Sequence, residues 1–220
     1  SGLKRAEIQP RNPNDRKKSW YKPQFEIKSE DERSDAEQAL LRFSNAAFRR
    51  PVKPDEVSTY LKLFEAERDK GEPFEPALRT AATAILCSPH FLFLRETPGE
   101  LDDFSLASRL SYFLSRAAPD DKLLALARQG KLRANLRTQT ERLLKHDRFG
   151  RFITDFTEAW LNLRDMDFTI PDRTLYPEYE PYLRFSMPRE TEAFLRELIE
   201  GNHPVANVVK SDFAMIKDRM

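Results

Sequence analysis

The chain has 220 residues, and its 37 Lys and Arg nearly cancel its 36 Asp and Glu, which leaves a formal net charge of +1. Such a balanced charge creates no field that would attract a polyanion, so nucleic-acid binding is disfavoured. The length suffices for one large domain or two small ones. The single cysteine, Cys87, excludes an internal disulfide and a CxxCH haem site. No stretch reaches the roughly 18 apolar residues that a membrane-spanning helix requires.

The N-terminal segment, residues 1–33, is polar, contains three prolines and shows no helical period. We interpret it as an extended linker or arm, in which the short runs 3–8 and 25–27 adopt extended conformations. Regular helical structure is expected to begin after it.

A small three-helix module is predicted over residues 34–96. Ser34 and Glu37 form a capping-box pattern that opens its first helix, and this helix is expected to end at Arg49-Arg50-Pro51. The two arginines then lie beside the negative end of the dipole of that helix. We prefer this structural role for them to a phosphate-binding site.

Two further helices of this module are predicted at 54–70 and 76–87, each bounded by a proline at its start. Cys87 lies in an apolar helical stretch and is expected to be a buried, unreactive thiol. The apolar run 90–94 is expected to pass through the core.

A larger helical module is predicted over residues 97–220. Its start, 101–132, is typical of two amphipathic helices joined by a corner at Ala118-Pro119-Asp120-Asp121, with Asp120 as the N-cap of the second. The segment 149–163 has the cleanest apolar period and should be the most buried helix. Pro188 either opens the last long helix or kinks a longer one that begins near Tyr182. The sequence therefore predicts an all-α, irregular bundle of eight to nine helices with an extended N-terminal arm.

Patterns for metal binding and nucleophilic catalysis are missing from the sequence. His90, His146 and His203 are far apart, and none belongs to an HxxxH or HExxH pair. The chain has no Walker or Rossmann glycine pattern and no GxSxG. Paired carboxylates that could act as acid and base are frequent, but most are better explained as helix caps and first-turn residues. We assign no catalytic residue, no metal ligand and no cofactor to this chain.

Three charged residues are not explained by capping. Arg109 lies one position from the apolar stripe of its helix. We expect it to be partly buried and paired with a carboxylate from elsewhere in the chain, because an unpaired buried charge is costly. Arg189 and Glu190 begin a late helix beside aromatic residues. These three residues are the candidates for a buried ion pair, and the expected role of such a pair is structural.

Several runs of the chain, taken together, carry a family resemblance: RFSNAAFRRPVKPDEVSTYLKLF, SPHFLFLRE, LASRLSYFLSRAAPDDKLLALARQGKL, FTEAWLNLRDMD, YLRFSMPRETEAFLRELIEGN and SDFAMIKDRM. They resemble consecutive helical domains of unknown function in the large planctomycete-type, cytochrome-c-associated multidomain (PSD-type) proteins. The resemblance covers residues 40–220 and depends on the combination of these runs.

The resemblance implies an exported protein of the periplasm or cell envelope. Such proteins often carry a haem site in another segment, and this chain has no motif for one, so haem is expected only in a domain outside it. The resemblance also implies a further module after the SDFAMI-like end, so Met220 is expected to be a truncation. The implied partners are other domains of the same polypeptide or envelope proteins. The charge balance and the lack of a long apolar stretch predict no nucleic-acid partner and no membrane span.

Two functions remain open from the sequence, and a third, nucleic-acid binding, would require a basic face with exposed aromatic residues. The first is a non-catalytic helical scaffold or interaction module. The second is part of a redox or polysaccharide-directed enzyme whose site other domains complete. The residues of interest for the enzyme are Arg109, His90, Trp160, Arg189 and Glu190. A deep pocket that gathers three or more of them would favour the enzyme, and scattered positions would favour the scaffold.

Overall fold

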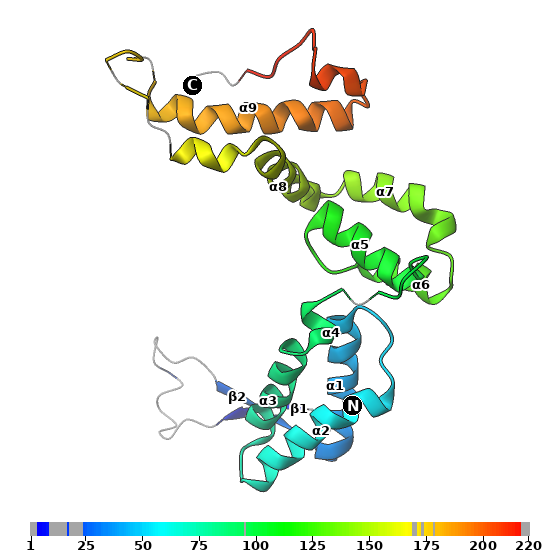
Figure 1. Ribbon diagram of the computed structural model, residues 1–220. Coiled ribbons are helices and arrows are strands. Elements are labelled where there is room, and N and C mark those ends of the chain that lie inside the picture. Colours follow the sequence, from blue (N-terminus) through cyan, green and yellow to red (C-terminus); the bar gives the residue numbers. More distant parts are fainter. Residues whose placement is uncertain are drawn as a thin grey trace. The chain divides into compact units, whose positions relative to one another are not determined.

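A computed structural model describes residues 4–8, 17, 24–94, 96–168, 171–172, 174–177 and 179–216. This part of the chain contains nine α-helices and one two-stranded hairpin, which confirms the predicted all-α fold with an extended arm (Figure 1). The chain divides into two compact units, residues 1–105 and 106–220, and each is described by itself. No helix in the described part is long and apolar enough to cross a membrane.

The first unit begins with an antiparallel hairpin. Strand β1 (Lys4–Ile8) pairs with β2 (Gln24–Lys28), so that Lys4 lies opposite Lys28 and Ala6 opposite Glu26. The predicted extended runs are therefore strands, and the side chain of Ile27 packs against the helical core of this unit. Of the predicted arm, residues 1–3, 9–16 and 18–23 lie outside the described residues.

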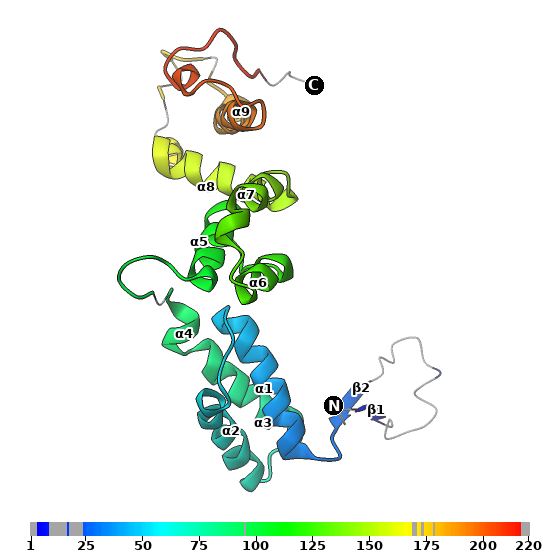
Figure 2. The same ribbon diagram turned by 90° about the vertical axis from the view of Figure 1, so that its right-hand side faces the viewer.

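Four helices complete the first unit: α1 (Glu32–Phe48), α2 (Pro54–Asp69), α3 (Phe74–Leu86) and the single turn α4 (Pro89–Leu92). The first three pack side by side in both views (Figures 1 and 2). Their apolar stripes meet in one core, whose fully buried members include Leu40, Val57, Phe64, Ala77 and Ile85. Helix α1 starts earlier than predicted, because the Asp31 side chain caps it by accepting the Ser34 N–H at 3.1 Å.

Two burial predictions for this unit are wrong. Cys87 is exposed, because it follows the last residue of α3 and lies on the outer side of that helix end. The run 90–94 does not pass through the core: Leu92 is 60% exposed and Phe93 is 64% exposed. Local apolar content predicted their burial, but the neighbouring helices cover only the other side of this segment.

The second unit contains the remaining helices: α5 (Asp103–Ser115), α6 (Asp121–Arg128), α7 (Leu136–Leu144), α8 (Gly150–Leu161) and α9 (Pro181–Glu200). Short 3-10 helices lie between or after them at Arg133–Asn135, Asp147–Phe149, Leu163–Asp167 and Val205–Val208. Its core gathers Ala107, Leu123, Leu132, Phe149 and Ile153. The units divide within the first turn of α5.

The predicted corner before α6 is confirmed, because the Asp120 side chain accepts the Leu123 N–H at 3.0 Å. Pro188 lies inside α9, so the longer of the two predicted helices is the correct one. The prediction that 149–163 is the most buried helix is wrong. On α8 only Ile153 and Thr157 are buried, while Trp160 is 50% exposed. Its apolar residues extend over more of the helix surface than the neighbouring helices cover.

Candidate functional site

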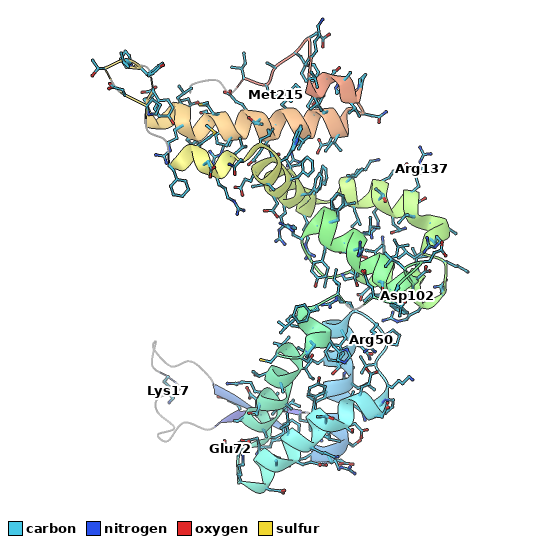
Figure 3. The ribbon with its side chains drawn as sticks, viewed as in Figure 1. Lys17, Arg50, Glu72, Asp102, Arg137 and Met215 are labelled. Atoms are coloured by element: carbon cyan, nitrogen blue, oxygen red, sulfur yellow. The ribbon has the colours of Figure 1, made fainter. Side chains whose placement is uncertain are left out.

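A cluster of charged and aromatic side chains joins three helices of the first unit. We call Phe48, Arg49, Arg50, Glu56 and His90 the arginine cluster. Phe48 is the last residue of α1, Glu56 lies in the first turn of α2, and His90 belongs to α4. Figure 3 shows Arg50 near the upper ends of these helices.

Arg49 is almost fully buried, with 5% of its surface exposed. Its guanidinium group donates hydrogen bonds to the carbonyl oxygens of His90 (3.1 Å), Phe91 (3.1 Å) and Phe93 (3.2 Å). Carbonyl groups at a helix end lack partners within the helix, and a cation is favourable there. Arg49 therefore stabilises the end of α4, which corrects the prediction that both arginines serve the end of α1.

Arg50 forms a two-pronged ion pair with Glu56. Its Nη2 lies 2.7 Å from Oε1 and its Nη1 lies 3.1 Å from Oε2. Glu56 Oε2 also accepts the backbone N–H of Lys53 at 3.0 Å and so caps α2. The hydrogen bond from Arg50 is the main reason why the pKa of Glu56 falls to about 2, and the same bond raises the pKa of Arg50. The pair is therefore ionised at any physiological pH.

His90 completes the arginine cluster from α4. Its ring centroid lies 5.1 Å from that of Phe48, and its Nδ1 lies 3.4 Å from Arg50 Nη2. Because arginine can only donate, this contact assigns Nδ1 as the acceptor and places the ring proton on Nε2. The side chains of this cluster thus form hydrogen bonds with other groups of the same unit. The bonds of Arg49, Arg50 and Glu56 hold α1, α2 and α4 together.

A second ion pair joins α6 and α7 in the second unit. The Asp120 carboxylate accepts from Arg142 Nη1 at 2.7 Å and from Nη2 at 3.2 Å while it caps α6. Burial raises the pKa of Asp120, but the hydrogen bonds from Arg142 and from the Leu123 N–H lower it further, so the net pKa is below its ordinary value. This pair therefore also has a structural role.

An aromatic row follows α8 and continues to α5. We call Phe113, Phe149, Phe152, Phe156 and Trp160 the aromatic strip. Successive ring centroids lie 5.0 Å (Phe113–Phe152), 5.4 Å (Phe149–Phe152), 5.3 Å (Phe152–Phe156) and 5.6 Å (Phe156–Trp160) apart. Phe149 is buried, but Phe113 is 60% exposed and Phe156 is 39% exposed. Phe149 and the half-buried Phe152 thus anchor the strip in the core, while Phe113, Phe156 and Trp160 are open to solvent.

The two arginines among the candidate ion-pair residues are more exposed than predicted. Arg109 and Arg189 are exposed and Glu190 is half-buried. The guanidinium carbon of Arg189 lies 3.2 Å from the ring centroid of Phe185, one turn earlier in α9. The burial prediction fails because Arg109 lies just outside the covered stripe of α5, and a long side chain can then reach solvent. The pairing of Arg109 with a carboxylate stays a prediction.

The residues of interest for an enzyme belong to different elements. His90 lies in α4 of the first unit, whereas Arg109, Trp160 and Arg189 lie on α5, α8 and α9. Two cavities of the second unit are lined by other residues. Within the described ranges, no three His, Cys, Asp or Glu side chains gather closely enough to hold a metal ion.

Sequence reasoning missed the role of Arg49 and the Arg50–Glu56 pair. A signal for Glu56 was present, because Glu three residues after a helix N-cap completes a capping pattern. No local signal connects Arg49 with α4, which lies more than 40 positions away in the chain.

Comparison with known families identifies two consecutive domains. The family described as PSD4, a protein of unknown function (DUF1592), matches residues 101–220. The family described as PSD5, a protein of unknown function (DUF1595), matches residues 35–96. These matches confirm the resemblance to PSD-type domains of unknown function. The chain has no significant match among curated proteins or among solved structures.

Proposed function

The chain belongs to the PSD4 family of proteins of unknown function (DUF1592), with a PSD5 domain before that region, and we propose that it is a non-catalytic helical scaffold and interaction segment of a larger protein. That protein is exported to the periplasm or cell envelope and contains a cytochrome c segment elsewhere in its chain. The haem belongs to that segment, and the domains described above hold it in place.

The aromatic strip is the observation that carries this proposal. Phe113 and Trp160 expose 60% and 50% of their surfaces on one row of rings. Contiguous exposed apolar surface of this kind is typical of an interaction site. The rings of Phe149, Phe152 and Phe156 are nearly parallel, with interplanar angles of 15° and 24°. Phe113 meets Phe152 at 62°, and Trp160 is tilted by 38° from Phe156.

The arginine cluster supports the scaffold part of the proposal. Its charged groups bind backbone carbonyls and one another, and in this way they fix the relative positions of α1, α2 and α4. A charge used in this way stabilises a fold. We propose that the occupant of the aromatic strip is another domain of the same polypeptide.

Hydroxyl-radical footprinting of the natural full-length protein tests the proposal, with the 220-residue chain measured in parallel. We expect oxidation of Phe113 and Trp160 to fall at least five-fold in the full-length protein. Tyr176, which is 54% exposed outside the strip, is the control and should react equally in both samples. Equal oxidation of Phe113 and Trp160 in the two proteins would contradict an intramolecular occupant.

Two further measurements on the full-length protein complete the test. Its absorption spectrum should contain the bands of a c-type haem, and a spectrum without them would contradict the cytochrome c association. Protection of the aromatic strip only when a separate envelope protein co-purifies would show that the occupant is that protein, which would overturn the intramolecular assignment.

A further inference from the structure

A cavity of about 550 Å³ lies in the second unit between α7, the 3-10 helix Asp147–Phe149 and α9. Pockets that bind small molecules commonly have volumes of roughly 300–1,000 Å³. The aromatic strip takes no part in its lining, so the cavity is a separate feature from the proposed docking surface.

The two helices line the cavity with the same set of residue types. Helix α7 and its end contribute Glu141, Leu144 and Lys145, and α9 contributes Arg196, Ile199 and Glu200. Each set contains one acid, one base and one aliphatic residue at a spacing that places them on one face of a helix. Leu144 and Ile199 pack against the core of the unit and provide an apolar floor. The walls carry both signs of charge.

Some of these charges are available to a ligand. Lys145 and Asp147 are exposed, and neither forms a side-chain hydrogen bond or ion pair with the described residues. Between them in the sequence lies His146, whose Nδ1 accepts the Arg148 N–H at 3.1 Å. That bond leaves the proton on Nε2, so the ring can donate. One wall therefore offers an ammonium group, an N–H donor and a carboxylate.

On the opposite wall, one nitrogen of the Arg196 guanidinium group, Nη2, is available to a ligand. Arg196 uses Nη1 to bind Glu200 Oε1 at 3.1 Å. Its Nη2 lies over Gly150, 3.2 Å from the place where a Cβ atom of that residue would be. The lack of a side chain at position 150 allows this close approach, and Nη2 retains donors for a further acceptor.

We propose that this cavity binds a small zwitterion with an apolar body, of the class of apolar α-amino acids. The ligand carboxylate binds Lys145 and Arg196 Nη2, the ligand ammonium group binds Asp147, and the apolar body rests on Leu144 and Ile199. A simple anion would meet the carboxylates of Glu141, Asp147 and Glu200, and a simple cation would meet Lys145 and Arg196, so only a molecule with both charges is matched by the walls.

Three probes of the same shape test the assignment in the 220-residue chain. They are leucine, 4-methylpentanoate, which lacks the ammonium group, and 3-methylbutylamine, which lacks the carboxylate. Titrations followed by two-dimensional NMR should shift resonances of the lining residues with leucine, and each singly charged analogue should bind at least ten-fold more weakly. No shift with leucine, or equal affinity for 4-methylpentanoate, would overturn the proposal.

Charge-neutralising variants identify the two ends of the ligand. K145Q should weaken leucine and 4-methylpentanoate at least five-fold and leave 3-methylbutylamine unchanged. D147N should weaken leucine and the amine and leave 4-methylpentanoate unchanged. K131Q removes an exposed charge of the same unit outside the cavity and is the matched control. Equal affinities in K145Q, D147N and the control would contradict the assignment.

G150A tests the role of the close approach. The added methyl group requires the Arg196 guanidinium to shift by a few tenths of an ångström, so we expect a small loss in leucine affinity, at most about three-fold. Unfolding by urea is measured for every variant, so that loss of binding is interpreted only for folded protein. A G150A variant that is folded and binds leucine like the wild type would show that leucine binding does not depend on the close approach of Arg196 to Gly150.

Discussion

Arg49 occupies a left-handed backbone conformation, with φ 59°, and its guanidinium group lies in the interior of the first unit. For a residue with a side chain, this conformation costs roughly 1 kcal/mol of free energy relative to glycine. Its hydrogen bonds to three carbonyl oxygens offset that cost, because they satisfy partly buried carbonyl groups at the end of α4.

Two variants at position 49 separate these effects. Both R49A and R49G lose the guanidinium group, and we expect R49A to lower the free energy of unfolding by about 3 kcal/mol. R49G should lower it by about 1 kcal/mol less, because glycine adopts positive φ without strain. Urea unfolding at pH 7 measures both. An R49A variant as stable as the wild type would show that the three carbonyl groups find other partners.

Glu56 makes the stability of the first unit depend on pH in the acidic range. Its pKa is about 2 in the folded protein and 4.5 in its ordinary state, so the unfolded chain binds the proton more readily. The contribution of Glu56 is therefore complete above about pH 4.5 and is lost as the pH falls towards 2. E56Q should cost about 1 kcal/mol at pH 7, as expected for a partly exposed two-pronged pair.

The difference between wild type and E56Q should shrink between pH 5 and pH 3 in urea unfolding curves. E75Q is the control, because it breaks the exposed pair between Glu75 and Arg79 within α3. We expect that control to cost less than about 0.5 kcal/mol. An E56Q effect that is constant from pH 7 to pH 3 would contradict the role of the Arg50–Glu56 pair.

At the scale of elements, the start of α6 combines two functions in one side chain. Asp120 caps the helix and binds Arg142 of α7 through both guanidinium nitrogens. D120A should lower the free energy of unfolding by about 2 kcal/mol, because it removes the cap and the pair. D120N keeps a capping side chain and should cost about 1 kcal/mol less. Urea unfolding monitored by circular dichroism distinguishes the two variants. If D120A and D120N lose the same free energy of unfolding, the cap does not contribute to the stability.

Helices α6 and α8 show how far a local pattern predicts an element. The Asp120 cap of α6 depends on groups three residues apart, so the sequence predicts it correctly. The period of α8 predicts a helix, but it cannot say which side other helices cover. Phe156 and Trp160 therefore belong to an exposed strip, although their spacing matches a buried face.

At the scale of the whole molecule, the described part of the chain contains two cores. One is built from residues of α1–α3 and the other from residues of α5–α9, each with residues of the connections between its helices. The family matches follow the same order, with PSD5 before PSD4. The contacts described above therefore each lie within one unit. Those of Arg49 and Glu56 belong to the first unit, and those of Asp120 and the cavity belong to the second.

The sequence by itself determined the all-α class, most helix positions and the family, because caps, breakers and apolar periods are local properties. Only the tertiary structure decided that Arg49 binds α4, that Arg196 lies over Gly150, and that the aromatic strip is left open. Each of these depends on which residues distant in the chain come into contact, and a single sequence carries no local signal for such contacts. The same reason explains why the burial predicted for Arg109 and Arg189 failed while their helices were correctly predicted.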